Sequence, residues 1–270
     1  MGQPVAGNPS QFMMERSFAA AGLDWRYLTL EVSPEDLPAA VAGMKAMGFR
    51  GGNFTIPHKV AVIPHLKRLT EAAELMGAVN CIYAEEDGFV GENTDGKGFV
   101  TALQEVIDPA GKRIVVLGAG GAARAIAVEL GLHKAASIDI VNRDAGRGRD
   151  LANLLSERVG LESKWIPWNG THALAEGDEI VINATSVGLC DGSAMVPVDP
   201  TTFRESMIVA DVIFNPPNTC FLQAAEEAGC QTIDGLGMLV NQGVIGFKIW
   251  TGVDPDPAVM REALEEYLGI

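Results

Sequence analysis

The stretch that most constrains the fold runs over residues 112–127. It opens with a short apolar, β-branched run at 114–117, which is typical of a buried parallel strand. Gly118, Gly120 and Ala123 follow at the GxGxxA spacing, and an apolar helical pattern comes directly after them. These small residues permit a tight turn, close approach of the backbone to a pyrophosphate, and close helix–strand packing. The stretch therefore predicts a dinucleotide-binding loop; the alternative is a phosphate-free turn in another α/β domain.

From residue 113 onward the pattern alternates between strands and helices. Apolar runs predict strands near 114–117, 137–141, 163–167, 179–183 and 207–213. This rhythm indicates an α/β fold with a Rossmann-type, doubly wound NAD(P)-binding domain, which we assign to residues 97–239. Residues 1–96, completed by C-terminal helices at about 240–270, are assigned to an α/β substrate-binding and catalytic domain.

The N-terminal domain mixes short helices with short strands. We expect Ser10 to cap its first helix and Ser33 to cap its second. The run at 25–32 predicts a strand. A helix expected over 97–107 leaves Asp95 on the polar loop before it.

The composition argues against several classes of protein. A net charge of −15 over 270 residues repels nucleic-acid phosphates, so we expect no nucleic-acid partner. No apolar run approaches the ~18 residues of a membrane span, and no signal peptide is visible, so a cytoplasmic location is expected. The four cysteines lie apart and the four histidines do not cluster, which predicts reduced thiols and no metal site.

The end of the second Rossmann strand bears on the cofactor. An acidic residue there usually binds the ribose 2′-hydroxyl of NAD, but this strand ends in Asn142 and Arg143. Arg143, backed by Arg147, suits the 2′-phosphate of NADP through a bidentate guanidinium contact. Asp144 would favour a hydroxyl over a phosphate. We therefore expect NADP, with NAD as the alternative cofactor and a solvated helix start as the alternative role of the arginines.

Two charged side chains are candidates for proton transfer. Lys59 follows a short strand at a helix start, where the helix dipole opposes its charge, and Asp95 precedes a later helix. As a pair they could relay a proton to or from a substrate hydroxyl while hydride moves to or from a nicotinamide. The alternatives are a surface lysine and a simple helix cap, because the two residues lie far apart in the sequence.

The chain resembles the shikimate dehydrogenase family over nearly its whole length. The matching segments, in order, are 53–59, 77–80, 93–95, 118–122, 142–143, 183–188, 211–216 and 234–242. The resemblance implies reversible, NADP-linked reduction of 3-dehydroshikimate to shikimate, a step of the chorismate pathway in aromatic amino acid biosynthesis. It also implies that Lys59 and Asp95 are the catalytic pair. We expect a monomer or a homodimer.

The family's motifs also assign binding residues. By match to them, the substrate would be held by Ser10, Thr55, Lys59, Asn80, Asp95 and Gln242, with Asn8 and Phe214 beside it. The cofactor site would be lined by Gly118, Ala119, Gly120, Gly121, Ala122, Asn142, Arg143, Arg147, Thr185, Val212 and Gly235.

Four departures from the family pattern affect these expectations, and the first is Asp144, described above. Asn8 stands where the family has the first of two serines that bind the substrate carboxylate, and Phe214 stands where a tyrosine is common. Losing one such hydrogen bond costs on the order of 0.5–1.5 kcal/mol. The family's first strand, before Gly2, is absent, so either the start lies upstream or the first sheet loses a strand. The alternatives are therefore a dehydrogenase of quinate or another cyclic hydroxy acid, using NAD or both cofactors, and a non-catalytic ligand-binding protein on this scaffold.

Overall fold

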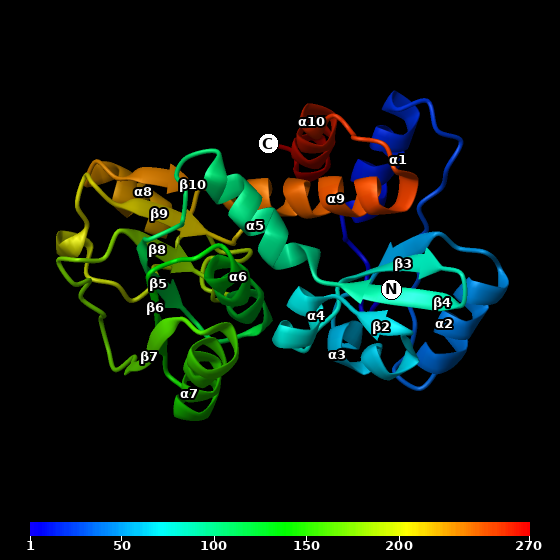
Figure 1. Cartoon of the computed structure of the whole chain (residues 1–270). Coiled ribbons are helices and arrows are strands. Elements are labelled where there is room, and N and C mark those ends of the chain that lie inside the picture. The colour runs from blue at the N-terminus through cyan, green and yellow to red at the C-terminus, as the bar shows by residue number, and fades with distance from the viewer. The chain divides into compact units, whose positions relative to one another are not determined.

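The computed structural model describes residues 1–270, which divide into two compact units. Unit 1 comprises Met1–Asp95 and Val240–Ile270, and unit 2 comprises Gly96–Leu239. The chain passes between the units near the start of α5 (Thr94–Gln104) and within α9 (Gly235–Thr251) (Figure 1). None of the helices combines the length and apolar character that a membrane span requires.

Unit 2 is built on a six-stranded parallel sheet with the order β10-β9-β8-β5-β6-β7. Its strands are β5 (Arg113–Leu117), β6 (Ser137–Asn142), β7 (Glu162–Pro167), β8 (Ile180–Asn183), β9 (Ile208–Asp211) and β10 (Gln231–Ile233). Its other helical segments are α6 (Gly121–Leu132), α7 (Ala145–Leu154), a π-helical turn (Leu155–Val159), a 3-10 turn (Pro200–Thr202) and α8 (Cys220–Glu227). The doubly wound sheet and its five predicted strands are confirmed; the three-residue β10 was not predicted.

The central position of β5 explains its sequence. Helix-covered parallel strands are buried on both faces and need continuous apolar residues, and each residue of 114–117 is at most 2% exposed. From β5 the chain continues to β6 and β7 on one side, and then to β8, β9 and β10 on the other. Ligands of such sheets bind at the carboxyl ends of the strands where this order reverses, which here is between β5 and β8.

Unit 1 contains a four-stranded sheet with the order β1-β3-β4-β2. Its strands are β1 (Gly51–Asn53), β2 (Arg68–Leu69), β3 (Cys81–Glu85) and β4 (Gly88–Glu92). Its helices are α1 (Ser10–Ala20), α2 (Leu37–Ala46), α3 (His58–Ala61), a 3-10 turn (Ile63–His65), α4 (Glu71–Met76) and α10 (Pro257–Leu268). β3 and β4 pair antiparallel as a hairpin. Leu37, Val41 and Met44 of α2 join Phe54 and Ile82 in one buried cluster.

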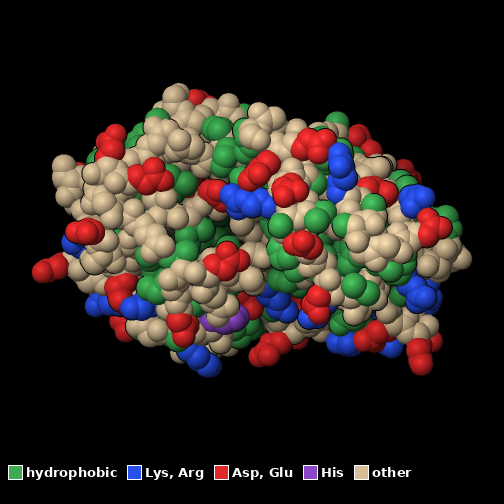
Figure 2. Space-filling model, turned by 90° about the horizontal axis from the view of Figure 1, so that it is seen from above, with side chains coloured by type: hydrophobic (Ala, Val, Ile, Leu, Met, Phe, Trp, Pro, Cys, Tyr) green, Lys and Arg blue, Asp and Glu red, His purple; other side chains and the backbone are tan.

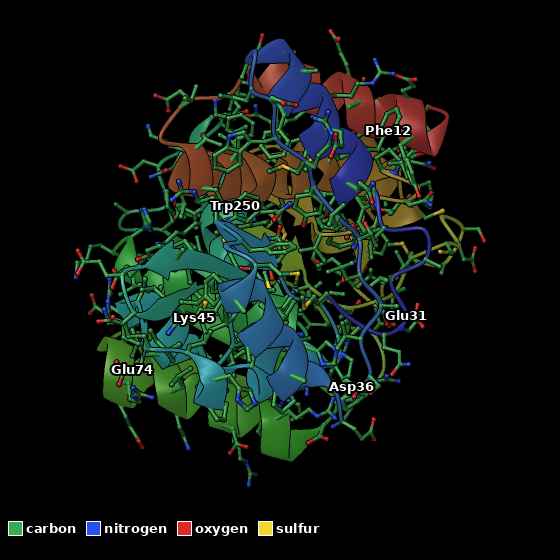
Figure 3. All side chains as sticks on the ribbon, turned by 90° about the vertical axis from the view of Figure 1, so that its right-hand side faces the viewer. Phe12, Glu31, Asp36, Lys45, Glu74 and Trp250 are labelled. Carbon is green, nitrogen blue, oxygen red and sulfur yellow. The ribbon has the colours of Figure 1, made fainter.

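The C-terminal helices complete unit 1. Figure 1 shows α1 beside α10, and the rings of Phe12 and Tyr267 on these helices lie 5.9 Å apart. Trp250 of α9, labelled in Figure 3, donates its Nε1–H to the carbonyl of Ile82 at 2.8 Å. A Cβ at position 51 would lie 2.3 Å from that Nε1, so Gly51 allows the indole to pack on the sheet.

The surface carries the acidic excess of the sequence. Asp and Glu outnumber Lys and Arg by 35 to 20, and Figure 2 shows acidic side chains spread over the visible face with basic ones among them. None of the four cysteines is joined in a disulfide.

The prediction of a strand at residues 25–32 is wrong. Apart from an isolated bridge at Glu31, the segment has no regular secondary structure. Side chains of α1 take its backbone donors: the N–H of Tyr27 donates to Glu15 Oε1, and that of Thr29 donates to Gln11 Oε1. With these donors engaged outside a sheet, no ladder forms along the segment.

Residues 1–3 lie between this segment and the chain that follows β1. Met1 accepts a hydrogen bond from the N–H of Thr55 at 2.9 Å, and Gly2 forms an isolated parallel bridge with Glu31. No additional strand lies beyond β1 in the sheet.

Two predicted helix caps are also wrong. Ser10 is the first residue of α1, the N-cap is Pro9, and no side chain caps the helix, although the N–H of Ser10 donates to Asn8 Oδ1 at 2.9 Å. Ser33 closes a turn with Asp36, and α2 begins after that turn at Leu37.

Candidate active site

The sheet of unit 1 brings three polar segments to one edge. β1 and β4 point in the same direction, because each pairs antiparallel with β3. Cys81, at the start of β3, is paired with Asn53 at the end of β1 and with Glu92 at the end of β4. The residues just beyond this row therefore meet, and they include Lys59, Asn80 and Asp95.

Lys59 and Asp95 form an ion pair. Lys59 Nζ lies 2.6 Å from Asp95 Oδ2, and the two side chains are 34% and 19% exposed. Asp95 occupies the first turn of α5, which begins at Thr94, so the expected loop position before a helix at 97 is wrong. The structure thus joins two residues whose pairing sequence spacing alone left open, and the pair stays accessible to a ligand.

Asn80 orients the carboxylate of Asp95. The backbone N–H of Thr94 donates to Asn80 Oδ1 at 2.7 Å, which directs Asn80 Nδ2 toward Asp95 Oδ1, also at 2.7 Å. Both oxygens of Asp95 are therefore hydrogen-bonded, one by an amide and one by an ammonium group. Such a fixed amine–carboxylate pair can give a proton to, or take one from, a substrate oxygen.

Behind the pair lies a supporting layer that sequence reasoning missed. Glu92 is 5% exposed, and its Oε1 accepts from the N–H of Asn93 and the hydroxyl of Thr70, each at 2.8 Å. Asn93 Oδ1 accepts from the N–H of Asp95 at 3.1 Å. The available signal was the run of polar residues that directly follows the apolar strand β4.

The other predicted substrate residues lie in both units. Asn8 and Ser10 are at the start of α1, Thr55 follows β1, and Gln242 is buried on α9, all in unit 1. Phe214 follows β9 in unit 2. Of the predicted substrate residues, Asn80 and Lys59 hydrogen-bond directly to Asp95. The substrate contacts of all of them stay predictions.

The glycine-rich loop of unit 2 fits a dinucleotide phosphate. Gly118 has φ +108°, and a Cβ there would lie 3.0 Å from the carbonyl oxygen of Ala184. No side chain caps α6 at Gly120, and a Cβ on Gly120 or Gly121 would meet nothing within 4 Å. Uncapped N–H groups beneath open space are what a pyrophosphate at a helix start requires. Ala119 and Ala122 belong to the same turn.

Gly118 and Gly120 should therefore respond differently to alanine. We expect Gly118→Ala to lower the free energy of unfolding by about 1–3 kcal/mol, because its backbone conformation suits only glycine. Gly120→Ala should leave stability within about 0.5 kcal/mol of wild type, yet weaken dinucleotide binding by filling the phosphate space. Urea unfolding and cofactor titration measure the two effects; equal stability of the two variants would contradict this account of the loop.

The structure clarifies the position of Asp144. It is the N-cap of α7: Oδ1 accepts from the N–H of Arg147 at 3.1 Å, and Oδ2 lies 3.8 Å from Arg147 Nε. Asn142, at the end of β6, donates its Nδ2–H to the carbonyl of Asp144 at 2.8 Å. Because the helix start and Arg147 compensate the Asp144 charge, exposed Arg143 can still serve an anionic 2′-phosphate.

A buried polar network joins the carboxyl ends of β8 and β9. Asn183 Nδ2 donates to Asp211 Oδ1 at 2.9 Å, Thr219 donates to Asp211 Oδ2 at 2.8 Å, and Thr185 donates to Asn183 Oδ1 at 2.7 Å. Burial raises the pKa of Asp211 to about 6, and the hydrogen bonds that it accepts oppose this rise. The sequence analysis named Thr185 as a site residue but did not name Asp211. The signal that could have identified Asp211 is a charged residue at the end of the apolar strand β9.

The remaining predicted cofactor residues adjoin this network. The N–H of Val212 donates to the carbonyl of Asn183 at 3.0 Å. A Cβ on Gly235 would lie 2.4 Å from the carbonyl oxygen of Ile213, so glycine lets α9 begin against that backbone. No group of three or more His, Cys, Asp or Glu side chains is arranged to hold a metal ion.

Asp211 should make stability depend on pH. The pKa of Asp211 in the folded state, about 6, exceeds the ordinary value of 3.8. The contribution of its protonated carboxyl to the free energy of unfolding is therefore full below pH 3.8 and is lost as pH rises through 6. As pH rises from 4 to 7, we expect the free energy of unfolding of Asp211→Asn to increase by up to about 3 kcal/mol relative to that of wild type. Urea unfolding across this range, with exposed Asp108→Asn as the control, measures the change. A stability difference independent of pH would contradict the raised pKa.

Three family models match successive parts of the chain. A shikimate dehydrogenase substrate binding domain matches residues 1–82, shikimate / quinate 5-dehydrogenase matches residues 101–234, and a shikimate 5′-dehydrogenase C-terminal domain matches residues 235–265. The "Shikimate dehydrogenase (NADP(+))" of Moorella thermoacetica is 42% identical over 273 residues, covering 100% of this chain and 92% of that protein. The chain belongs to the shikimate dehydrogenase family.

Solved structures agree with this membership, and the similar proteins are named for more than one substrate. The ligand-free 5-ketofructose reductase of Gluconobacter sp. strain CHM43 matches with a TM-score of 0.97 and 50% identity, over 98% of this chain and 96% of that one. Shikimate 5-dehydrogenase from Thermus thermophilus, in complex with NADP(H) and shikimate, matches with a TM-score of 0.86 and 35% identity, over 99% and 97%. The shikimate dehydrogenase fold therefore spans the full chain.

Proposed function

We propose that this member of the shikimate dehydrogenase family is an NADP-dependent oxidoreductase that interconverts 3-dehydroshikimate and shikimate, with Lys59 and Asp95 as its catalytic pair. The observation that carries the proposal is the 2.6 Å contact between Lys59 Nζ and Asp95 Oδ2, held in place by Asn80. Unit 1 would bind the substrate and unit 2 the dinucleotide. NADP(H) supplies the hydride chemistry when bound.

In the reductive direction, the ammonium of Lys59 donates a proton to the ketone oxygen as the carbonyl carbon gains hydride, which yields the secondary alcohol. The amine then regains a proton from water. In the oxidative direction, the neutral amine accepts the hydroxyl proton. Asp95 holds the amine in place and shares its proton, and Asn80 keeps the carboxylate turned toward it.

NADP is favoured over NAD by the residues after β6. Arg143 is exposed, and the Asp144 carboxylate is engaged by the start of α7. The loop at Gly118–Ala122 would carry the pyrophosphate, with Thr185, Val212 and Gly235 bordering the site. We place the reaction in the cytoplasm, since cysteines that form no disulfide are typical of a reducing compartment.

A second candidate is reduction of a neutral keto-sugar such as 5-ketofructose. Two observations favour it: the 50% identity to the Gluconobacter 5-ketofructose reductase, and the residues that should recognise a carboxylate. Asn8 replaces a serine of the family loop, and its Oδ1 is already occupied by the N–H of Ser10. A substrate without a carboxylate does not need the replaced hydroxyl.

A substrate panel separates the candidates. Reduction of 3-dehydroshikimate and 5-ketofructose, and oxidation of shikimate and quinate, are followed by nicotinamide absorbance with each cofactor pair. We expect the highest kcat/KM with NADP(H) and the shikimate pair. A kcat/KM at least tenfold higher for 5-ketofructose or for quinate would replace the leading proposal. Thermal stabilisation by shikimate without turnover under any condition would indicate a ligand-binding protein.

A further inference from the structure

A chain of four hydrogen bonds leads from the aromatic residue Tyr27 to the ion pair. The Tyr27 hydroxyl donates to Asn53 Oδ1 at 2.7 Å, and Asn53 Nδ2 donates to the carbonyl of Asn80 at 3.1 Å. Asn80 Nδ2 donates to Asp95 Oδ1, and Asp95 Oδ2 accepts from Lys59. All five residues belong to unit 1, although 68 positions separate Tyr27 from Asp95 in the sequence (95 − 27).

The donor and acceptor roles along this chain have one consistent assignment. The carbonyl of Asn80 can only accept, so Asn53 must present its NH₂ group to it and its oxygen to Tyr27. Tyr27 must then donate its proton to that oxygen. Removal of the hydroxyl from water raises the pKa of Tyr27, and nearby Cys81 adds to the rise, so the phenol keeps this proton.

Two further contacts hold Tyr27. Its backbone N–H donates to Glu15 of α1, and its ring lies 6.1 Å from that of Trp250 on α9. The hydroxyl therefore reaches Asn53 from a fixed position, although its segment belongs to no sheet. Asn53 adds the second hydrogen bond to the Asn80 carbonyl, which already accepts from the N–H of Phe54 at 2.8 Å.

We infer that Tyr27 is a positioning residue for the Lys59–Asp95 pair and acts through Asn53 and Asn80. The inference rests on the proposed function for its kinetic consequence, but the orientation of Asn80 is a property of the folded chain alone. Without the Tyr27 hydroxyl, Asn53 loses the partner that holds its amide, the Asn80 backbone loosens, and Asp95 holds the amine less rigidly.

The kinetic test is Tyr27→Phe, with Tyr267→Phe on α10 as the matched control that removes the same atom elsewhere in unit 1. We expect Tyr27→Phe to lower kcat by about three- to tenfold, as for the loss of one hydrogen bond. The KM for NADP(H) should not change, and the solvent deuterium isotope effect on kcat should rise because proton transfer becomes more rate-limiting. Wild-type kcat and isotope effect in Tyr27→Phe would overturn the inference.

A double-mutant cycle tests the route through Asn53. If Tyr27 acts through this residue, Asn53→Ala combined with Tyr27→Phe should be no slower than Asn53→Ala alone. If the two substitutions lower kcat by independent factors that multiply in the double variant, Tyr27 does not act through Asn53.

A measurement that needs no turnover separates the inference from the proposed function. The side-chain amide resonances of Asn80 in ¹⁵N NMR should shift in Tyr27→Phe and stay in place in Tyr267→Phe. Unshifted Asn80 resonances would overturn the inference even in an active enzyme. Absence of wild-type turnover would instead count against the proposed function.

Discussion

Lys59→Ala should lower kcat by about 10³-fold while leaving dinucleotide binding intact. General acid–base catalysis contributes about 10²–10⁴ in rate, and Lys59 is the amine that the structure places against the Asp95 carboxylate. The cofactor residues lie in unit 2, so loss of a unit 1 side chain should not alter the dissociation constant of NADP(H). Steady-state kinetics and cofactor titration by fluorescence measure the two quantities.

Two further variants test the reason for this effect. Lys67→Ala removes a lysine of unit 1 that pairs with Glu85 near the surface, and it should keep near-normal kcat. Asp95→Asn keeps the shape of the side chain but removes its charge, so we expect a loss approaching that of Lys59→Ala. Near-normal turnover by Lys59→Ala would remove the proposed role of the pair and with it the mechanism.

Arg143→Ala should weaken NADP binding by about 10- to 100-fold and change NAD binding by less than about twofold. Hydrogen bonds between a guanidinium and a phosphate contribute about 1.5–3 kcal/mol, and only NADP carries the 2′-phosphate. Arg143 follows directly after β6, where the adenosine ribose of a Rossmann ligand is bound. The ratio of kcat/KM values for the two cofactors measures the effect.

Arg149→Ala is the matched control. It removes a guanidinium from α7, but that group lies over the ring of Trp165, 4.7 Å from its centroid. We expect an unchanged cofactor ratio in this variant. If Arg143→Ala also leaves the ratio unchanged, the assignment of the 2′-phosphate to Arg143 is wrong and the cofactor preference must be explained by other residues.

Much of unit 2 could be predicted because its signals are local. The apolar run 114–117, the small residues at 118, 120 and 123, and the alternation that follows all reflect backbone requirements that act over a few positions. β10 was not predicted because it has only three residues, which form a strand by pairing with the edge of β9 and show no strand pattern in the sequence.

The errors in unit 1 arose where a distant side chain decided the outcome. Residues 25–32 have the apolar content of a strand, but Glu15 and Gln11 on α1 take the backbone donors of Tyr27 and Thr29. That competition depends on how α1 lies against the segment, and no local pattern records it. The error at Ser10 is instead local: the helix begins at Ser10 itself, so this residue lies inside α1 rather than at its N-cap.

The sequence by itself determined the α/β class and the family, and it identified the glycine-rich loop at 118–122, Lys59 and Asp95 as candidate site residues. Only the tertiary structure decided that these two side chains meet, that Asn80 orients them, and that Asp144 caps α7. The physical reason is that propensities and motif spacing act over a few residues along the chain. The contact between Lys59 and Asp95 instead depends on the register of β1, β3 and β4, which places three separate strand ends in one row.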